Sequence, residues 1–237
     1  MYSFQPVAIL HSCFKEKFAI PRQPALAPAA KGQIELLAPF DDPHALQGLE
    51  GISHLWITFV FHQAIQAPDE VRLRVRPPRL GGNQKVGVFS TRSTHRPNPI
   101  GLSVVKLEKI EGTKLYVSGI DLLDQTPILD IKPYVPYADI VTSAENKIAE
   151  QAPELITVQW QEEAKLSAEK ESKRLNQDVI ALIEQCLAQD PKPAYQTPDS
   201  ERQYGVQFWD LNIRWHYPEP DCIRVLSVTP VNSEASE

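Results

Sequence analysis

The sequence predicts a mainly β protein, with a small single-sheet β-barrel domain followed by a small α+β domain. Three observations support this fold class. Short apolar or alternating runs recur at close spacing in the first 140 residues, without a helical run of ten or more residues between them. Proline is frequent, at 21 residues against 10 glycines, and proline divides a chain into short strands and fixed loops. After residue 164 the apolar period changes to that of a helix.

The first domain is expected over residues 1–140. Turn residues separate its apolar runs, as is typical of the strands of a barrel or sandwich. The expected strands lie at residues 4–10, 34–39, 54–61, 71–75, 86–89, 102–107, 115–120 and 128–131.

The second domain is expected over residues 153–232. A single amphipathic helix is predicted at residues 164–189, ending before the Asp190-Pro191 pair because proline cannot continue a helix. Three strands should follow, at residues 203–211, 213–217 and 222–228. The acidic ending NSEASE is interpreted as a frayed terminus.

The composition indicates a cytoplasmic protein. The 237 residues have a formal charge of −6, and they suffice to bury a core without disulfides or metals. The N-terminus becomes charged too early for a signal peptide, and no apolar run is long enough to cross a membrane. Cys13, Cys186 and Cys222 form no CxxC pair, so we expect neither a disulfide framework nor a metal site.

A basic island covers residues 72–96 of this acidic chain. Its ionised side chains are Arg72, Arg74, Arg76, Arg79, Lys85, Arg92 and Arg96, without Asp or Glu. A local cluster of this kind favours contact with an anion over extended coating of nucleic acid. The alternative for Arg72, Arg74 and Arg76 is the solvated face of a strand.

The segment at residues 77–103 reads PPRLGGNQKVGVFSTRSTHRPNPIGLS. Gly81-Gly82-Asn83 can adopt positive φ and bring backbone N–H groups close to a ligand. Arg92 and Arg96 offer planar forks for a carboxylate or phosphate, and Pro97 and Pro99 stiffen the turn. This pattern is typical of a binding loop, although a plain hairpin connection would have a similar composition.

Several segments together closely resemble the TrmO family, also called YaeB-like or TsaA-like. They are GVFSTRSTHRPNPIGLS, PPRLGG, GIDLLDQTPILDIKPY, KEKFAIPRQP, GLEGISHLWITFVFHQ, DPKPAY and NIRW. The resemblance covers both expected domains. It implies a homodimeric enzyme that uses S-adenosylmethionine to methylate N6 of threonylcarbamoyladenosine at position 37, in the anticodon loop of tRNA. It also implies a cofactor held by barrel loops, and the sequence contains no GxGxxG after a strand that would indicate a Rossmann site.

The resemblance also implies site residues. The expected cofactor-binding residues are Pro21, Arg22, Gln23, His62, Gln63, Arg92, Leu102, Asp121, Leu122, Leu123 and Asp124. Arg96 and Lys192 are expected to bind the tRNA substrate. Lys192 stands where the family usually has Arg, so it keeps the charge but loses the bidentate fork.

The chemistry requires an aligned nucleophile and removal of the N6 proton, because the N6 lone pair is conjugated to adenine and a carbonyl. We expect Asp190 and Tyr195 to be catalytic residues for this step, because they form a polar motif at a helix end. Without the resemblance, Asp121 and Asp124 could be turn residues, and His62 and Gln63 could cap a strand. Two other functions stay open: a non-enzymatic module for an anionic ligand or RNA, and a methyltransferase of this fold with another acceptor.

Overall fold

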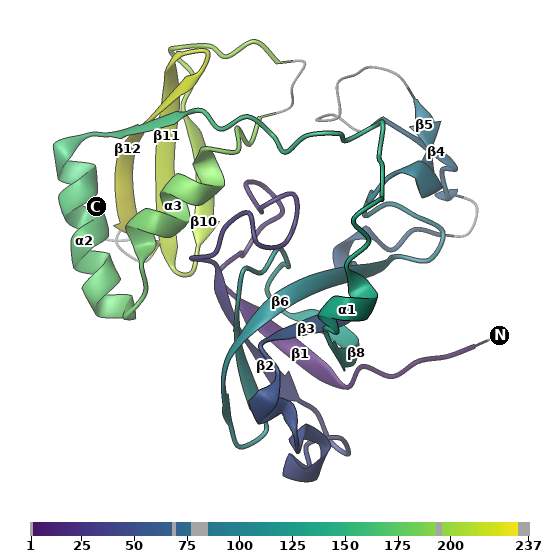
Figure 1. Ribbon diagram of the computed structural model, residues 1–237. Coiled ribbons are helices and arrows are strands. Elements are labelled where there is room, and N and C mark those ends of the chain that lie inside the picture. The colour runs from purple at the N-terminus through teal and green to yellow at the C-terminus, as the bar shows by residue number, and fades with distance from the viewer. Residues whose placement is uncertain (1, 68–69, 77–84, 193–195, 232–237) are drawn as a thin grey trace.

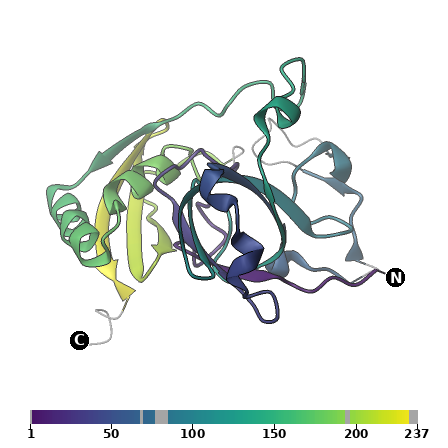
Figure 2. The same ribbon diagram turned by 60° about the horizontal axis from the view of Figure 1, so that its bottom comes forward.

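The computed structural model describes residues 2–67, 70–76, 85–192 and 196–231, which form two domains joined by a linker (Figure 1). The N-terminal domain is a closed barrel in the order β1-β2-β7-β6-β3-β8, with all neighbouring strands antiparallel. Its ring of strands is visible in Figure 2. The strands are β1 (Ala8–Ser12), β2 (Lys31–Leu36), β3 (His54–Val60), β6 (Ile100–Glu111), β7 (Lys114–Ser118) and β8 (Thr126–Pro133). The predicted mainly β fold with a barrel is confirmed.

Alternation along the strands builds the barrel core. On β3 the side chains of Leu55, Ile57 and Phe59 are buried, whereas Trp56 and Val60 are only partly buried. Because successive strand residues point to opposite faces, the second set lies on the outside of the barrel. The outer surface of β3 is therefore available to a site.

Two of the predicted strands lie outside the barrel. β4 (Arg74–Val75) and β5 (Val86–Gly87) pair only with each other, in a separate two-stranded sheet. The Arg74 guanidinium donates to the Lys85 carbonyl at 2.9 Å, and the Arg72, Arg74 and Arg76 side chains are exposed. Arg79 and Gly81-Gly82-Asn83 lie outside the described residues.

The C-terminal domain is a four-stranded sheet with two helices. The sheet order is β10-β11-β12-β9, and β9 is parallel to β12. Its strands are β9 (Thr157–Trp160), β10 (Tyr204–Phe208), β11 (Leu211–Glu219) and β12 (Cys222–Pro230). Both helices cover one face of the sheet (Figure 1). Within the described parts of the chain, no helix is long and apolar enough to cross a membrane.

The prediction of one helix at residues 164–189 is wrong, because the chain forms α2 (Glu162–Leu175) and α3 (Val179–Leu187). Asn176 ends α2 in the left-handed conformation, with φ 51°. Asp178 then starts α3, since its carboxylate accepts a bond of 2.9 Å from the Ala181 N–H. Asn and Asp favour these two capping positions, so the break is encoded locally.

A segment at residues 13–30 of the barrel domain packs against the C-terminal domain. Phe14 bridges to Phe208 on β10, with ring centroids 5.5 Å apart. The Phe18 ring stacks on that of Trp215 at 5.8 Å, and the backbone N–H of Trp209 donates to the Cys13 carbonyl at 2.7 Å. Phe14, Phe208 and Trp215 are fully buried, so this segment ties the two domains together.

Candidate functional site

A large cavity lies beside the barrel, with a volume of about 990 Å³. Its lining comes from the segments 17–24, 56–64, 89–104 and 121–126, together with Tyr134 and Asp139. The volume is at the upper end of the usual range for ligand pockets, roughly 300–1,000 Å³. The site is therefore large enough for a ligand of cofactor size.

The paired ends of β3 and β6 bring these segments together. Val60 is opposite Ile100 in the ladder, and the Phe61 N–H donates to the Pro99 carbonyl at 2.7 Å. A Cβ at Gly101 would lie 2.3 Å from the Phe59 ring, so this position requires glycine. The chain after β3 turns through a short 3-10 helix, His62–Ala64, which directs His62 and Gln63 to the cavity.

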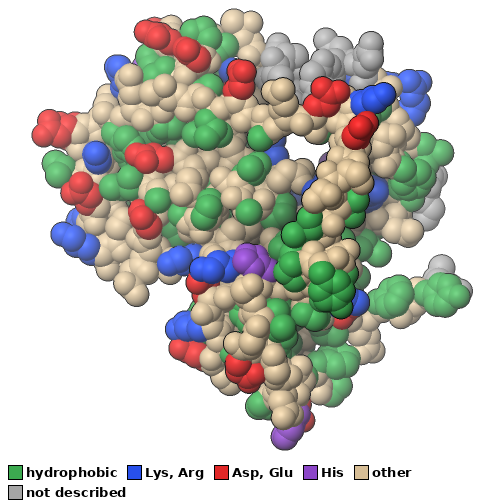
Figure 3. Space-filling view, in the orientation of Figure 1, with side chains coloured by type: hydrophobic (Ala, Val, Ile, Leu, Met, Phe, Trp, Pro, Cys, Tyr) green, Lys and Arg blue, Asp and Glu red, His purple; other side chains and the backbone are tan. Residues whose placement is uncertain are grey.

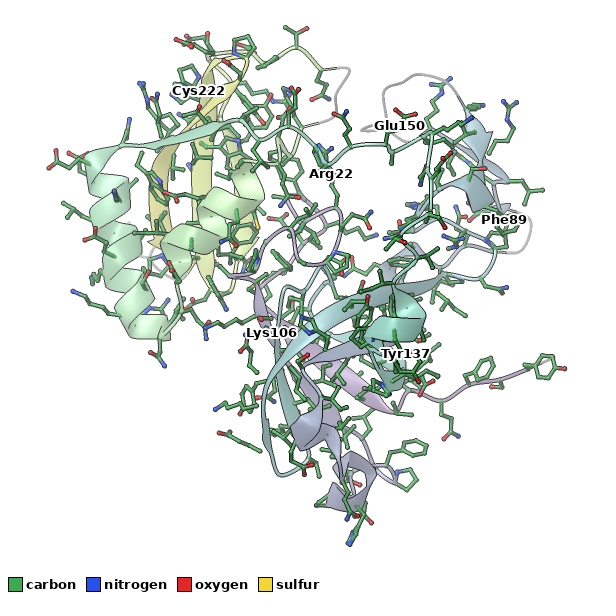
Figure 4. The ribbon with its side chains drawn as sticks, in the orientation of Figure 1. Arg22, Phe89, Lys106, Tyr137, Glu150 and Cys222 are labelled. Atoms are coloured by element: carbon green, nitrogen blue, oxygen red, sulfur yellow. The ribbon has the colours of Figure 1, made fainter. Side chains whose placement is uncertain are left out.

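Arg22 lies on the loop between the two domains (Figure 4) and lines the cavity. Its Nη2 donates to the carbonyls of Gln189, at 2.9 Å, and Asp190, at 3.2 Å. Its backbone N–H donates to the Gln189 Oε1 at 3.4 Å. The C-terminal domain thus holds the Arg22 loop against the cavity.

Arg92 is held by the same loop, because its Nη1 donates to Gln23 Oε1. The charge of Arg92 also acts on Asp121, which lines the cavity and accepts a bond of 2.7 Å from the Ser103 hydroxyl. Burial raises the pKa of Asp121 to about 6, although Ser103 and Arg92 oppose the shift. The cavity thus contains a carboxyl group that titrates near neutral pH.

His62 and Asp124 have different surroundings. Burial lowers the pKa of His62, which favours the neutral imidazole. Asp124 does not line the cavity; it accepts bonds from the Lys15 ammonium at 2.7 Å and the Ser12 N–H at 2.8 Å. Burial alone would raise the pKa of Asp124, but these two partners lower it overall. Asp124 thus anchors the loop that carries Asp121.

Most of the residues expected to bind the cofactor or the substrate line this cavity. They are Pro21, Arg22, Gln23, His62, Gln63, Arg92, Arg96, Leu102, Asp121, Leu122 and Leu123. Lys17 also lines it and donates to the Gln63 carbonyl at 2.6 Å. The Arg96 Nη1 donates to the Thr91 carbonyl at 3.3 Å.

Asp190 and Lys192 are not among the residues that line the cavity, although the Asp190 carbonyl contacts Arg22, which is one of them. The Lys192 ammonium contacts the Asp190 carboxylate at 2.7 Å, and the Tyr217 hydroxyl donates to the other carboxylate oxygen at 2.9 Å. Burial first, and then the neighbouring Asp190, raise the pKa of Tyr217. Tyr195 lies outside the described residues, so the expected Asp190 and Tyr195 pair stays a prediction.

The sequence did not single out two aromatic side chains, Trp56 and Tyr134, that line the cavity. The Trp56 Nε1 donates to Asp139 at 2.9 Å, and its ring lies 5.8 Å from the Tyr134 ring. Asp139 ends the short helix α1 (Pro136–Asp139), which closes over the outside of β3. Strand alternation was the signal that could have found Trp56, since it is out of phase with the buried Leu55 and Ile57.

This arrangement can bind a ligand with a flat ring and an anionic group. Arginines, aromatic rings and the carboxyl groups of Asp121 and Asp139 meet in a single cavity, whose lining combines apolar with polar side chains. Across the described residues, no cluster of three or more His, Cys, Asp or Glu side chains is placed to hold a metal ion.

Comparisons with known proteins cover both domains. A family model described as the tRNA-methyltransferase O N-terminal domain matches residues 9–140, and one described as the TrmO C-terminal domain matches residues 153–231. The tRNA (adenine(37)-N6)-methyltransferase of Escherichia coli is 43% identical over 220 residues, covering 90% of this chain and 92% of that protein.

Two comparisons with Pseudomonas aeruginosa proteins span nearly the whole chain. RcsF, which its name assigns to the S-adenosylmethionine-dependent methyltransferases, is 61% identical over 227 residues, or 96% of this chain and 97% of that protein. The crystal structure of TrmO from the same organism superposes with a TM-score of 0.83 at 53% identity, covering 97% of each chain.

Proposed function

Because the chain belongs to the tRNA-methyltransferase O family, we propose that it transfers a methyl group from S-adenosylmethionine to N6 of adenosine 37 in tRNA. The acceptor we propose is the threonylcarbamoyl-modified adenosine, presented by the anticodon loop in the cytoplasm. The observation that carries the proposal is the large cavity, where most of the residues expected to bind the cofactor meet in a chain that matches the family over both domains.

The cofactor fits the chemistry of the cavity. It has an amino-acid carboxylate, a cationic sulfonium and an adenine ring. We assign the carboxylate to Arg92, because the Nη2 of Arg22 already donates to two carbonyls of the C-terminal domain. We assign the adenine to backbone groups of Leu122 and Leu123 and to the side chain of Leu102, because these residues line the same cavity. The remaining volume, next to Trp56 and Tyr134, is available to the acceptor base.

Two carboxyl groups are candidates for removing the N6 proton. Asp190 was expected from the sequence, but it already accepts bonds from Lys192 and Tyr217 outside the cavity. Asp121 lies in the cavity, and its pKa of about 6 suits a general base near neutral pH. We therefore assign proton removal to Asp121, with Asp190 as the alternative that the same experiment tests.

A homodimer is part of the proposal. Apolar side chains remain exposed on and beside the outer face of β3 and β6: Ile100 and Leu102 on β6, and Tyr137, Ile140 and Val141 on α1 and the linker after it. Figure 3 shows hydrophobic side chains gathered over α1. Leu102 is 55% exposed and also lines the cavity, so a second copy on this face would cover the site.

Cofactor binding and methyl transfer test the proposal together. Calorimetry measures S-adenosylmethionine binding, and a labelled methyl group measures transfer to tRNA. We expect Arg92→Ala to weaken cofactor binding more than about tenfold, because a charged hydrogen bond is lost. Arg72→Ala, which removes an exposed arginine of the same basic island, should leave it unchanged. Cofactor binding without transfer would favour the non-enzymatic module, and transfer only to another molecule would favour a different acceptor.

A further inference from the structure

A second, smaller pocket lies on the C-terminal domain, with a volume of about 340 Å³. It is lined by Phe18, Lys192, Gln196, Arg202, Gln203 and Tyr204, and none of these lines the large cavity. The lining combines two aromatic rings, two cations and two amide side chains. None of the described residues that line it carries a carboxylate, so the pocket favours an anionic ligand with a flat ring.

Arg202 is held in place before any ligand arrives. The Tyr204 ring stacks on the fully buried Trp215 at 6.0 Å, and the Arg202 guanidinium lies over the Tyr204 ring, 5.0 Å from its centroid. In the described part of the chain, Arg202 has no carboxylate within salt-bridge distance. A planar cation that is already positioned loses little conformational entropy when it binds a phosphate or stacks on a base.

Lys192 forms the base of the pocket. Its side chain is 8% exposed, its ammonium contacts Asp190, and it lies 5.5 Å from the centroid of the Tyr217 ring. Because Asp190 balances this charge, Arg202 supplies the uncompensated cation of the pocket. The amide groups of Gln196 and Gln203 can both donate to and accept from the edges of a base or a ribose.

The pocket and the large cavity are adjacent. Phe18 lines the small pocket, whereas Lys17 and Ile20, on either side of it in the chain, line the large cavity. One short segment therefore separates the two sites. A single RNA strand with one base in the large cavity could reach the small pocket with a neighbouring nucleotide.

We propose that the small pocket is a nucleotide subsite, which binds a phosphate and base of the tRNA strand flanking the target adenosine. Arg202 contacts the phosphate, and the glutamines contact the base or ribose. Single-stranded RNA is usually recognised by this combination of aromatic, arginine and amide side chains. The inference rests on the proposed function, and it adds a second contact that places the target base.

Kinetics with full-length protein and tRNA carrying the threonylcarbamoyl group test the subsite. We expect Arg202→Ala to raise the KM for tRNA about tenfold and to reduce the salt dependence of tRNA binding by about one ion. The kcat at saturating tRNA and the KM for S-adenosylmethionine should not change, because the contact is remote from the reacting atoms. Arg202→Lys should give an intermediate KM, since the charge stays and the planar fork is lost.

Lys173→Ala is the matched control, because Lys173 is an exposed cation of α2 in the same domain. It should leave the KM for tRNA unchanged. A KM for Arg202→Ala within about twofold of the wild-type value would overturn the subsite. Filter binding of the same tRNA, with its salt dependence, is measured separately. Absence of methyl transfer by the wild-type protein would contradict the proposed function. The comparison of tRNA binding by the wild type and by Arg202→Ala would still test the subsite.

Discussion

Asp121 is the residue on which the proposed chemistry depends. Its carboxyl group lies in the cavity, accepts a bond from Ser103, and is buried enough that its pKa rises to about 6. The nearby Asp124 has a lowered pKa, because Lys15 and Ser12 donate to it. Two carboxyl groups of one loop thus have different surroundings: Asp124 holds the loop through Ser12 and Lys15, and Asp121, the proposed base, lines the cavity.

We predict that methyl transfer rises with pH through about pH 6. The raised pKa of Asp121 means that its carboxylate forms only as the pH rises through that value, and a base must be deprotonated to act. Asp121→Asn should lower the single-turnover rate by roughly 10²-fold or more and abolish this pH dependence. Single-turnover rates across about pH 5 to pH 8 measure both effects.

Asp190→Asn serves as the comparison, because Asp190 was expected to be catalytic from the sequence. It should keep the pH profile and most of the rate. If Asp190→Asn loses the rate with cofactor binding intact while Asp121→Asn does not, proton removal belongs to Asp190 instead.

Gly101 on β6 lies against the ring of Phe59. An alanine here would place its Cβ 2.3 Å from the Phe59 ring in the barrel core, so the backbone or the ring must move. We expect Gly101→Ala to lower the free energy of unfolding by about 1–3 kcal/mol. Urea unfolding measures the change, with Gly51→Ala as control, because no atom lies within 4 Å of a Cβ built at Gly51. Equal stabilities of the two variants would contradict the packing described for β3 and β6.

At the level of the elements, α3 and the residues just after it hold the loop that carries Arg22 and Gln23. Gln189 is buried, and its Nε2 donates to the Leu26 carbonyl at 3.4 Å while its Oε1 accepts from the Arg22 N–H. Gln185, one turn earlier, accepts a bond of 2.8 Å from the Ala29 N–H. Two glutamines of the C-terminal domain therefore hold residues 22–29 of the barrel domain near both ends of that segment.

We predict that Gln189→Ala weakens S-adenosylmethionine binding about tenfold, because the loop carrying Arg22 and Gln23 loses its anchor. Calorimetry with the cofactor measures the effect. Gln161→Ala, which removes an exposed glutamine before α2, should bind the cofactor like the wild type. Unchanged affinity in Gln189→Ala would contradict a role of this anchor in cofactor binding.

The elements differ in how far the sequence predicts them. Alternation predicts β3, β6 and β8 well, because one face of each strand is buried in the barrel. It cannot show that β4 and β5 leave the barrel, since pairing is not visible in a local pattern. The break between α2 and α3 was missed because the apolar stripe continues through the caps at Asn176 and Asp178.

The sequence likewise predicts some features of the candidate site and not others. The resemblance named Arg22, Arg92 and Asp121, which the structure brings into one cavity. It could not reveal the ties from Gln189 to the Arg22 loop, or the Trp56 contact to Asp139, because these contacts join segments distant in sequence.

At the scale of the whole molecule, we predict that Ile140→Asp disrupts the proposed homodimer. Ile140 is 56% exposed on the apolar surface beside α1, and a buried unpaired charge is costly at an interface. Sedimentation velocity should show a dimer for the wild type and a monomer for the variant. Leu166→Asp, at a 58% exposed leucine of α2, should remain a dimer. A wild-type protein that sediments as a monomer would contradict the assembly.

The identity of the methylated nucleoside tests the proposed function most directly. The full-length protein is incubated with S-adenosylmethionine and tRNA, with or without the threonylcarbamoyl group, and the product is digested to nucleosides for mass analysis. We expect one added methyl group on threonylcarbamoyladenosine, and none on the unmodified tRNA. A methyl group on another nucleoside, or none on either tRNA while the cofactor binds, would contradict the proposed function.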